Sequence, residues 1–209
     1  MALIAGVDEA GKGCLFGSMV FGCAMYRDDG TLDRLGVNDS KKLTPKKRSM
    51  LYEKILDTAV DVQMLEFTAS HLDNYHKKGI TMTEMGIMGF AMILNGLSER
   101  PDVVYLDACH TNNEKFGRLV GERLKWDPLP KIVSEHKADA KFPIVGASSI
   151  VAKVERDELY KSLGYPGSGY TSDRITMDWV EDRYRKTKTF PDQTRMFWKT
   201  VENIKTKFG

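Results

Sequence analysis

The chain has 209 residues, of which 42% are hydrophobic and 29% are charged, and its formal net charge at pH 7 is +2. This length allows a substantial core in one domain with an appendage, and the composition is ordinary for a globular protein. No apolar run approaches the ~20 residues of a membrane span, and the N-terminus lacks the pattern of a signal peptide, so neither a membrane protein nor a secreted protein is expected.

Charge distribution and cysteine content add two weaker indications. Residues 137–209 carry 14 Lys and Arg against 10 Asp and Glu, whereas residues 1–136 carry 17 against 19. A basic C-terminal third fits a polyanionic partner, although many solvated helices have a similar balance. The three cysteines form no C-x-x-C pair, which predicts reduced thiols in a cytosolic protein.

The first predicted element is a buried strand that ends in two acids. Residues 3–7 are small or apolar and run directly into Asp8 and Glu9, and Gly11, Lys12 and Gly13 form the turn that follows. Two adjacent carboxylates at a buried strand end repel each other unless a proton or a cation compensates them, and a divalent metal ion does so most simply. The glycines let the backbone of the turn approach a phosphate or a sugar closely.

The same segment partly matches a phosphate-binding loop. Residues 6–12 fit the first seven positions of G-x-x-x-x-G-K-[ST], but Gly13 stands where the motif requires a hydroxyl for magnesium. Two acids inside a polyphosphate cradle also argue against this interpretation. A P-loop nucleotidase therefore stays a remote alternative.

The pattern of the remaining chain predicts a mixed α/β sheet with a helical C-terminal lobe. Further strands are predicted at residues 18–26, 61–67, 103–107 and 131–135. Helices are predicted at residues 45–57, 81–97, 112–124, 143–163, 173–187 and 192–207. In the first of these helices, we expect the inward side to consist of Met50, Leu51, Ile55 and Leu56.

Acids follow three of the predicted apolar segments. Asp8 and Glu9 follow the first strand, Asp107 ends a later strand, and Asp139 lies at a strand-to-helix junction. Each can therefore reach the same end of the sheet, where α/β proteins place their sites. An oxygen-only ligand set of this kind suits Mg²⁺ or Mn²⁺ better than zinc. With two ions, it would suit in-line cleavage of a phosphodiester.

Six sequence blocks follow one another along nearly the whole chain, at residues 7–13, 39–43, 105–108, 134–140, 147–153 and 167–170. Together they resemble the type 2 ribonuclease H family (ribonuclease HII), specifically its archaeal members. The resemblance implies a ribonuclease H-like fold, in which helices flank a five-stranded mixed sheet. It also implies a catalytic domain over residues 1–165 and a helical C-terminal region over residues 166–209 that helps to grip the duplex.

The resemblance further implies a metal-dependent endoribonuclease. Such an enzyme hydrolyses the RNA strand of RNA–DNA hybrids and incises 5′ to single ribonucleotides in duplex DNA, leaving 3′-hydroxyl and 5′-phosphate ends. Two Mg²⁺ or Mn²⁺ ions would take part, held by Asp8, Glu9, Asp107 and Asp139 as the catalytic acids. The implied partners are RNA–DNA hybrid and ribonucleotide-containing duplex DNA, with no membrane.

Two substrate contacts follow from the same resemblance. Gly11, Lys12 and Gly13 match the segment that senses the ribose 2′-OH through its backbone, and Tyr170 matches the tyrosine that stacks on the sugar next to the scissile phosphate. A 2′-OH is what distinguishes RNA from DNA at one position, and backbone groups freed by glycine can reach it. Other candidates for substrate contact, each with a structural alternative, are Ser40, Lys41, Lys42, Lys137 and Ser148.

Two rival functions stay open, a structure-specific DNA nuclease on the same fold and a non-catalytic hybrid-binding module. The Gly-Lys-Gly turn and Tyr170 argue against the first rival, and the presence of all four acids argues against the second. Residues 201–209 lack the glutamine-plus-aromatic motif by which some relatives dock on a sliding clamp. Clamp recruitment is therefore not expected. We also expect the protein to be a monomer.

Overall fold

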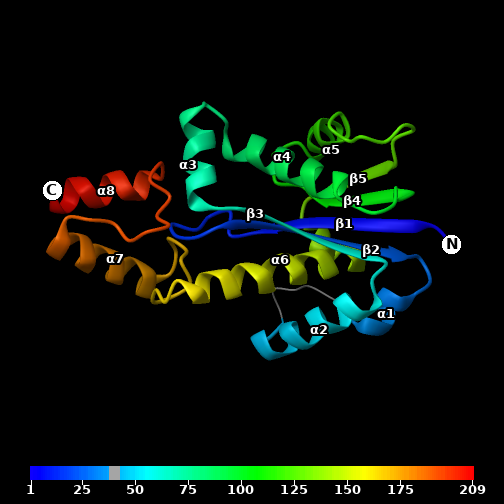
Figure 1. The fold of residues 1–209 in the computed structure, drawn as a ribbon, viewed down its shortest axis with the longest axis horizontal. Helices are drawn as coiled ribbons and strands as arrows, with labels where there is room; N and C mark the ends of the chain where they lie inside the picture. Colours follow the sequence, from blue (N-terminus) through cyan, green and yellow to red (C-terminus); the bar gives the residue numbers. More distant parts are fainter. Residues whose placement is uncertain (38–42) are drawn as a thin grey trace.

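A five-stranded mixed sheet forms the centre of the protein (Figure 1). The computed structural model describes residues 1–37 and 43–209. In spatial order, the strands are β3 (Asp61–Phe67), β2 (Met19–Arg27), β1 (Leu3–Ala10), β4 (Val103–Asp107) and β5 (Lys131–Glu135). β2 pairs antiparallel with β1 and β3, whereas β4 pairs parallel with β1 and β5. The predicted mixed α/β sheet is therefore confirmed.

Helices cover both faces of the sheet (Figure 1). One face packs against α1 (Thr31–Leu35), α2 (Pro45–Thr58) and α6 (Pro143–Ser162), and the other against α3 (Ala69–Lys77), α4 (Met82–Asn95) and α5 (Asn113–Gly121). Side chains of β1 alternate between the two cores, as the pleat of a strand requires. At one end of the molecule, α7 (Arg174–Thr187) and α8 (Lys199–Phe208) pack around a third apolar cluster that includes Leu15 and Phe16.

Glycines bring α6 close to the sheet. A Cβ atom at Gly22 would lie 2.4 Å from the carbonyl oxygen of Ser148, and one at Gly6 would lie 2.4 Å from that of Ile144. The buried Ser148 hydroxyl bridges the short gap, because it donates to the Gly6 carbonyl at 2.8 Å and accepts from the Ala24 amide at 3.1 Å. α6 is thereby fixed over β1 and β2, together with the side chains that it directs toward the end of β1.

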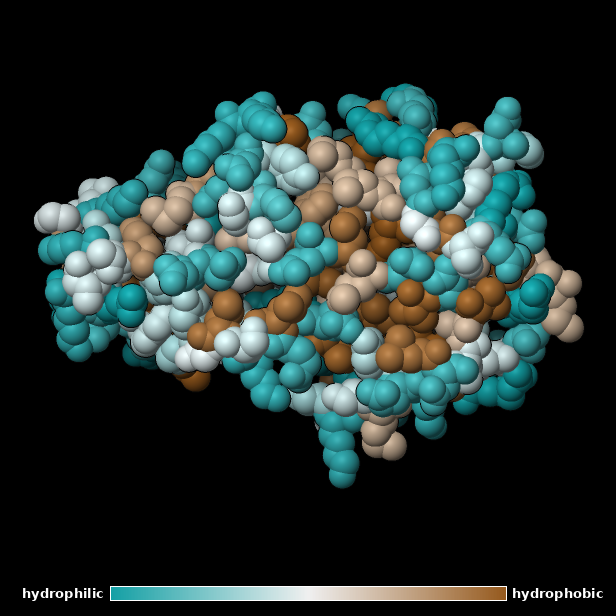
Figure 2. Space-filling view, in the orientation of Figure 1, coloured by the Kyte–Doolittle hydropathy of each residue, from teal (hydrophilic) through white to brown (hydrophobic). Residues whose placement is uncertain are grey.

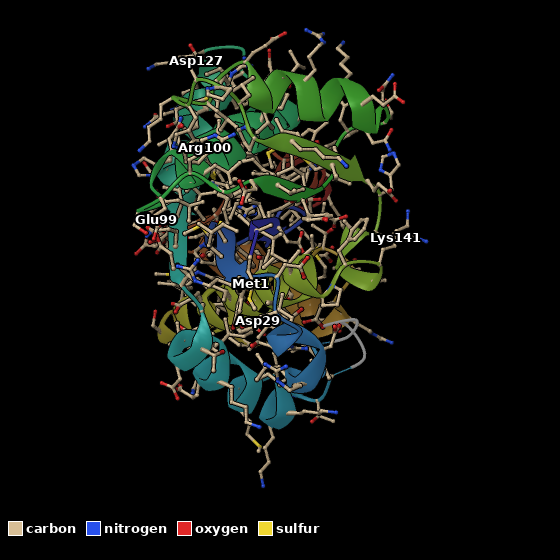
Figure 3. All side chains as sticks on the ribbon, turned by 90° about the vertical axis from the view of Figure 1, so that its right-hand side faces the viewer. Met1, Asp29, Glu99, Arg100, Asp127 and Lys141 are labelled. Atoms are coloured by element: carbon tan, nitrogen blue, oxygen red, sulfur yellow. The ribbon has the colours of Figure 1, made fainter. Side chains whose placement is uncertain are left out.

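The parallel register of β1 and β4 brings two of the predicted acids side by side. Val7 pairs with Leu106, and the next residue of each strand is an aspartate, Asp8 in β1 and Asp107 in β4. The site therefore lies at the carboxyl end of β1. The amino end of this strand, near Met1, faces the viewer in Figure 3.

Two helices that the sequence pattern did not predict are present. α1 is a short helix that begins after Gly30, a residue in the left-handed region with φ of 77°. α3 begins with a capping box in which His71 stands at the position that Glu or Gln usually occupies. The usual sequence pattern for the start of a helix is therefore absent.

The predicted start of the last helix is wrong. α8 begins at Lys199 and not near residue 192, because residues 193–195 pair with the loop that follows β1. The predicted inward side of α2 is also partly wrong. Met50 and Leu56 are exposed, since only Leu51 and Ile55 turn toward the sheet.

The outer surface is mixed in polarity. Figure 2 shows apolar side chains gathered near the middle of one face, and the edge strand β3 exposes half of the Met64 side chain. Among the helices that the structure describes, none combines the length and the apolar character needed to cross a bilayer.

Gly22→Ala is expected to lower the free energy of unfolding by about 1–3 kcal/mol, because the added methyl group must push α6 off β2. Urea unfolding followed by circular dichroism measures this change. Gly96→Ala is the control, since Gly96 caps α4 in a right-handed conformation that alanine adopts readily. Equal losses in both variants would contradict the close approach of α6 to the sheet.

Candidate active site

A cleft of about 450 Å³ opens at the carboxyl end of β1. Its walls come from the end of β1 and the turn after it, from β4, α2 and α6, and from the loop after α6. The lining residues are Asp8, Glu9, Ala10, Gly11, Lys12, Gly13, Arg48, Asp107, Ser149, Lys153 and Tyr170. Three of the four predicted acids, the whole predicted turn and the predicted tyrosine therefore share one cleft.

Asp8 is a buried carboxylate with two acidic neighbours in this cleft. Burial, and then the negative charges of Glu9 and Asp107, raise the pKa of the Asp8 carboxyl well above its ordinary value. Hydrogen bonds from the Ser149 hydroxyl and from the Glu9 amide, the latter at 2.7 Å, oppose this shift. The structure thus keeps Asp8 at a position where a negative charge is costly unless a cation approaches.

Asp107 and Asp139 come from neighbouring segments. Asp107 accepts a hydrogen bond of 2.9 Å from the amide of Ala138, the first residue of a 3₁₀ turn over Ala138–Ala140. Asp139 is the next residue of that turn and is buried, and it does not line the cleft. The structure therefore places Asp139 beside the carboxylate cluster and not in its exposed wall.

The donor set fits a hard divalent cation. The acids that line the cleft offer only oxygen, and a cation would offset the repulsion that raises the pKa of Asp8. Within residues 1–37 and 43–209, however, no group of three or more His, Cys, Asp or Glu side chains stands in an arrangement that holds a metal ion. Mg²⁺ is commonly held by one or two carboxylates together with waters and phosphate oxygens, so the acids of the cleft remain suitable ligands.

The side chain of Lys12 folds back over the turn. Its Nζ donates to the Cys109 carbonyl at 3.1 Å and lies 3.8 Å from Oε1 of Glu9. The lysine, which itself lines the cleft, thus partly balances the charge of the Glu9 carboxylate.

Tyr170 is attached to the same turn by main-chain and side-chain contacts. Its hydroxyl accepts a hydrogen bond of 3.2 Å from the Gly11 amide, and its backbone forms an antiparallel bridge with Cys14. The Lys153 ammonium lies 5.8 Å from the centre of its ring. Burial raises the pKa of the Tyr170 hydroxyl to about 12, so this group stays protonated at neutral pH.

Arg156 of α6 packs against the Tyr170 ring. Its guanidinium stacks at 4.7 Å from the centre of that ring and donates to the Ser168 carbonyl and to the Cys14 sulfur. No role was predicted for Arg156, because an arginine within a helical pattern carries no signal that it is buried. Arg48 and Lys153 also line the cleft without a predicted role.

The five weaker candidates have three outcomes. Ser40, Lys41 and Lys42 lie outside the residues that the structure describes. Lys137 is exposed, with a positive φ of 56°, at the start of the 3₁₀ turn. For Ser148 the structure favours the packing alternative to a substrate contact, because its hydroxyl is fully buried against β1 and β2. Its neighbour Ser149 lines the cleft instead.

The chain is similar to known proteins over nearly its whole length. The chain matches the family profile of Ribonuclease HII over residues 5–201. It is 42% identical to the Ribonuclease HII of Thermococcus sibiricus over 211 residues, which cover 98% of this chain and 92% of the relative.

Two solved structures from archaea have the same fold. The crystal structure of the ribonuclease H2 from Pyrococcus horikoshii OT3 superposes with a TM-score of 0.90 at 37% identity and covers 99% of this chain and 98% of that chain. The RNase HII of Archaeoglobus fulgidus, solved in complex with PCNA, gives a TM-score of 0.85 at 35% identity over 94% of this chain and 95% of that chain. The expected ribonuclease H-like fold is confirmed.

Asp8→Asn is expected to stabilise the metal-free protein at neutral pH, because the amide removes the charge whose burial and repulsion raise the pKa of this carboxyl. With a raised pKa, the folded state binds the proton more tightly than the unfolded state. Stability of the unsubstituted protein should therefore fall as the pH rises from the ordinary carboxyl pKa through the raised one.

Thermal unfolding in chelator from pH 4 to 8 measures both effects. Asp28→Asn, at an exposed position far from the cleft, is the control and should change stability by less than about 0.5 kcal/mol. A loss of stability in Asp8→Asn at pH 7 would contradict the repulsion described here.

Proposed function

The chain belongs to the ribonuclease HII family, an endonuclease family that hydrolyses RNA in RNA–DNA hybrids, and we propose that its cleft also incises duplex DNA on the 5′ side of a single ribonucleotide. The observation that carries this proposal is the meeting of the acid cluster with the Gly11–Gly13 turn and Tyr170 in one cleft. The acids are suited to breaking a phosphodiester bond, and the turn and the tyrosine are suited to recognising the sugar beside it.

The acids Asp8, Glu9 and Asp107, with Asp139 beside them, are proposed to hold divalent ions. Divalent-metal dependence is expected of the family, and Mg²⁺ or Mn²⁺ matches this oxygen-only donor set. When bound, one ion would lower the pKa of the attacking water and a second would stabilise the leaving 3′-oxygen. A phosphodiester is itself an anion, so these acids would repel the substrate without such compensation.

The walls of the cleft supply the contacts to the substrate. Lys153 and Arg48 bring positive charge to the wall of the cleft, and since both pair with one carboxylate, that of Asp157, a net positive charge remains to attract the nucleic-acid backbone. Gly11, Lys12 and Gly13 offer backbone close to a sugar, and Tyr170 offers an aromatic ring fixed against Arg156. Since the 2′-OH is the one group that distinguishes the ribonucleotide, we propose that the turn binds it.

A cleavage assay on three substrates tests this function. These are an RNA–DNA hybrid, duplex DNA with one ribonucleotide, and the same duplex made only of DNA, each with Mg²⁺, with Mn²⁺ and with chelator. We expect metal-dependent cutting of the first two, with the cut in the second mapped to the 5′ side of the ribonucleotide. Equal cutting of the all-DNA duplex would favour a DNA nuclease, and binding without cutting would favour a hybrid-binding module.

Asp107→Asn should reduce kcat on both RNA-containing substrates by more than about 100-fold, which exceeds the usual effect of losing a group that only orients a metal ligand. Asn113→Ala, in the first turn of α5, is a control outside the cleft. Steady-state kinetics in Mg²⁺ measures the change, with circular dichroism as a test of folding. Unchanged turnover in Asp107→Asn would remove this acid from the mechanism.

Tyr170→Ala should relax the choice of cutting position more than it weakens binding, because the ring orients the sugar while the basic walls supply affinity. Tyr170→Phe keeps the ring and removes the hydroxyl that accepts from Gly11, so it separates stacking from attachment to the turn. We expect the phenylalanine variant to retain the cutting position. Mapping of cuts at RNA–DNA junctions measures both, and a single unaltered position in the alanine variant would contradict the stacking role.

A further inference from the structure

A second buried arginine, Arg195, reaches the turn from the C-terminal region. It lies in the segment before α8, and its side chain is fully buried. Within the described parts of the chain, no carboxylate forms an ion pair with it, and its Nη2 atom has no hydrogen-bond partner. Burying a guanidinium without a carboxylate costs desolvation free energy, so the carbonyls that it contacts must compensate its charge.

The hydrogen bonds that the Arg195 guanidinium donates both end in the segment after β1. The Arg195 Nε donates to the Gly17 carbonyl at 2.9 Å, and Nη1 donates to the Lys12 carbonyl at 2.9 Å. The backbone amide of Arg195 donates to the Leu15 carbonyl, also at 2.9 Å. One planar guanidinium therefore spans the loop and fixes the orientation of the Lys12–Gly13 peptide.

The orientation of this peptide decides where the next amide points. A trans peptide is planar, and its carbonyl and its N–H point in opposite directions. Because the Lys12 carbonyl points inward at Arg195, the Gly13 N–H points outward. Gly13 is exposed and lines the cleft, so its N–H is directed to the side from which the substrate enters.

We propose that Arg195 is a positioning residue for ribose recognition, which aims the Gly13 N–H at the sugar 2′-OH by anchoring the Lys12 carbonyl. The inference rests on the proposed function, in which the turn reads this hydroxyl. Arg195 itself does not line the cleft, so it acts through the peptide and makes no contact with substrate. Recognition by the amino-terminal turn thus depends on a residue of the carboxyl-terminal region.

The variants Arg195→Lys and Arg195→Met separate charge from geometry. A lysine ammonium keeps the positive charge, but it lacks the planar fork that reaches two carbonyls in fixed directions. Methionine removes the charge and fills most of the space. Arg118→Lys is the control, because Arg118 is exposed on α5 and makes its ion pair with Glu122 outside the cleft.

Fluorescence anisotropy measures the ratio of affinities for two DNA duplexes. Ca²⁺ replaces Mg²⁺ in this experiment, and a gel checks that the duplexes stay intact. One duplex carries a single ribonucleotide, and the other is the same sequence made only of DNA. We expect a preference for the ribonucleotide duplex in the unsubstituted protein and in Arg118→Lys. The preference should fall about fivefold in Arg195→Met, which is the effect of losing one hydrogen bond. It should fall by less in Arg195→Lys. In both variants the affinity for the all-DNA duplex should stay unchanged.

A second readout follows the amide directly. In ¹⁵N-glycine-labelled protein, the Gly13 resonance should move when the ribonucleotide duplex binds and move much less with all-DNA duplex. This difference should shrink in Arg195→Lys, which serves as the informative variant where Arg195→Met fails to fold.

The outcomes separate the two proposals. If the unsubstituted protein shows no preference for the ribonucleotide duplex, the proposed function itself fails and the inference fails with it. If the preference is present and Arg195→Lys keeps it in full, with the Gly13 response unchanged, the inference alone is overturned. Equal weakening of both duplexes would indicate a purely structural role and would also overturn it.

Discussion

Mutual repulsion among Asp8, Glu9 and Asp107 is the constraint on which the site depends. The parallel register of β1 and β4 places the two aspartates side by side, and the chain itself places Glu9 next to Asp8. Burial and these neighbours raise the pKa of Asp8, so the folded protein without a cation bears an electrostatic cost. A site of this kind gains from a divalent ion twice, because the ion relieves the repulsion and also attracts the anionic substrate.

The rest of the fold holds this unfavourable arrangement in place. Close packing of α6 on Gly6 and Gly22 fixes the helix over the sheet. The hydroxyls of two consecutive residues of α6 then make two different contacts. Ser148 ties α6 to β1 and β2, whereas Ser149 turns to the cleft and hydrogen-bonds Asp8. The carboxyl-terminal region closes the other side, since Leu15 and Phe16 share an apolar cluster with α7 and α8. The proposed division at residue 165 thus crosses a shared core.

The sequence predicted those parts of the structure that depend on local pattern. Apolar runs located β3, β4 and β5 at their observed bounds, and acids at the ends of such runs indicated Asp8, Glu9 and Asp107, which the structure brings to one cleft. Features that depend on packing were not predictable in this way. Ser148 and Ser149 are indistinguishable in the sequence, and only the rotation of α6 decides which one faces the sheet.

The two buried arginines illustrate the same limit. Arg156 lies among charged residues and Arg195 directly follows a polar stretch, residues 192–194, as solvated arginines commonly do, yet both are buried against the segment after β1. Their partners lie far away in sequence, as with the Lys12 carbonyl that Arg195 contacts. No local period predicts such a contact, because it results from how the C-terminal region packs on the turn.

Anomalous diffraction from crystals grown with Mn²⁺ tests the central claim most directly. The account predicts anomalous peaks in contact with the carboxylates of Asp8, Glu9 and Asp107, and loss of these peaks in Asp107→Asn. The account would be contradicted if Mn²⁺ were absent from this cluster at a concentration that supports hydrolysis of an RNA–DNA hybrid. In that case no cation would offset the repulsion among the acids.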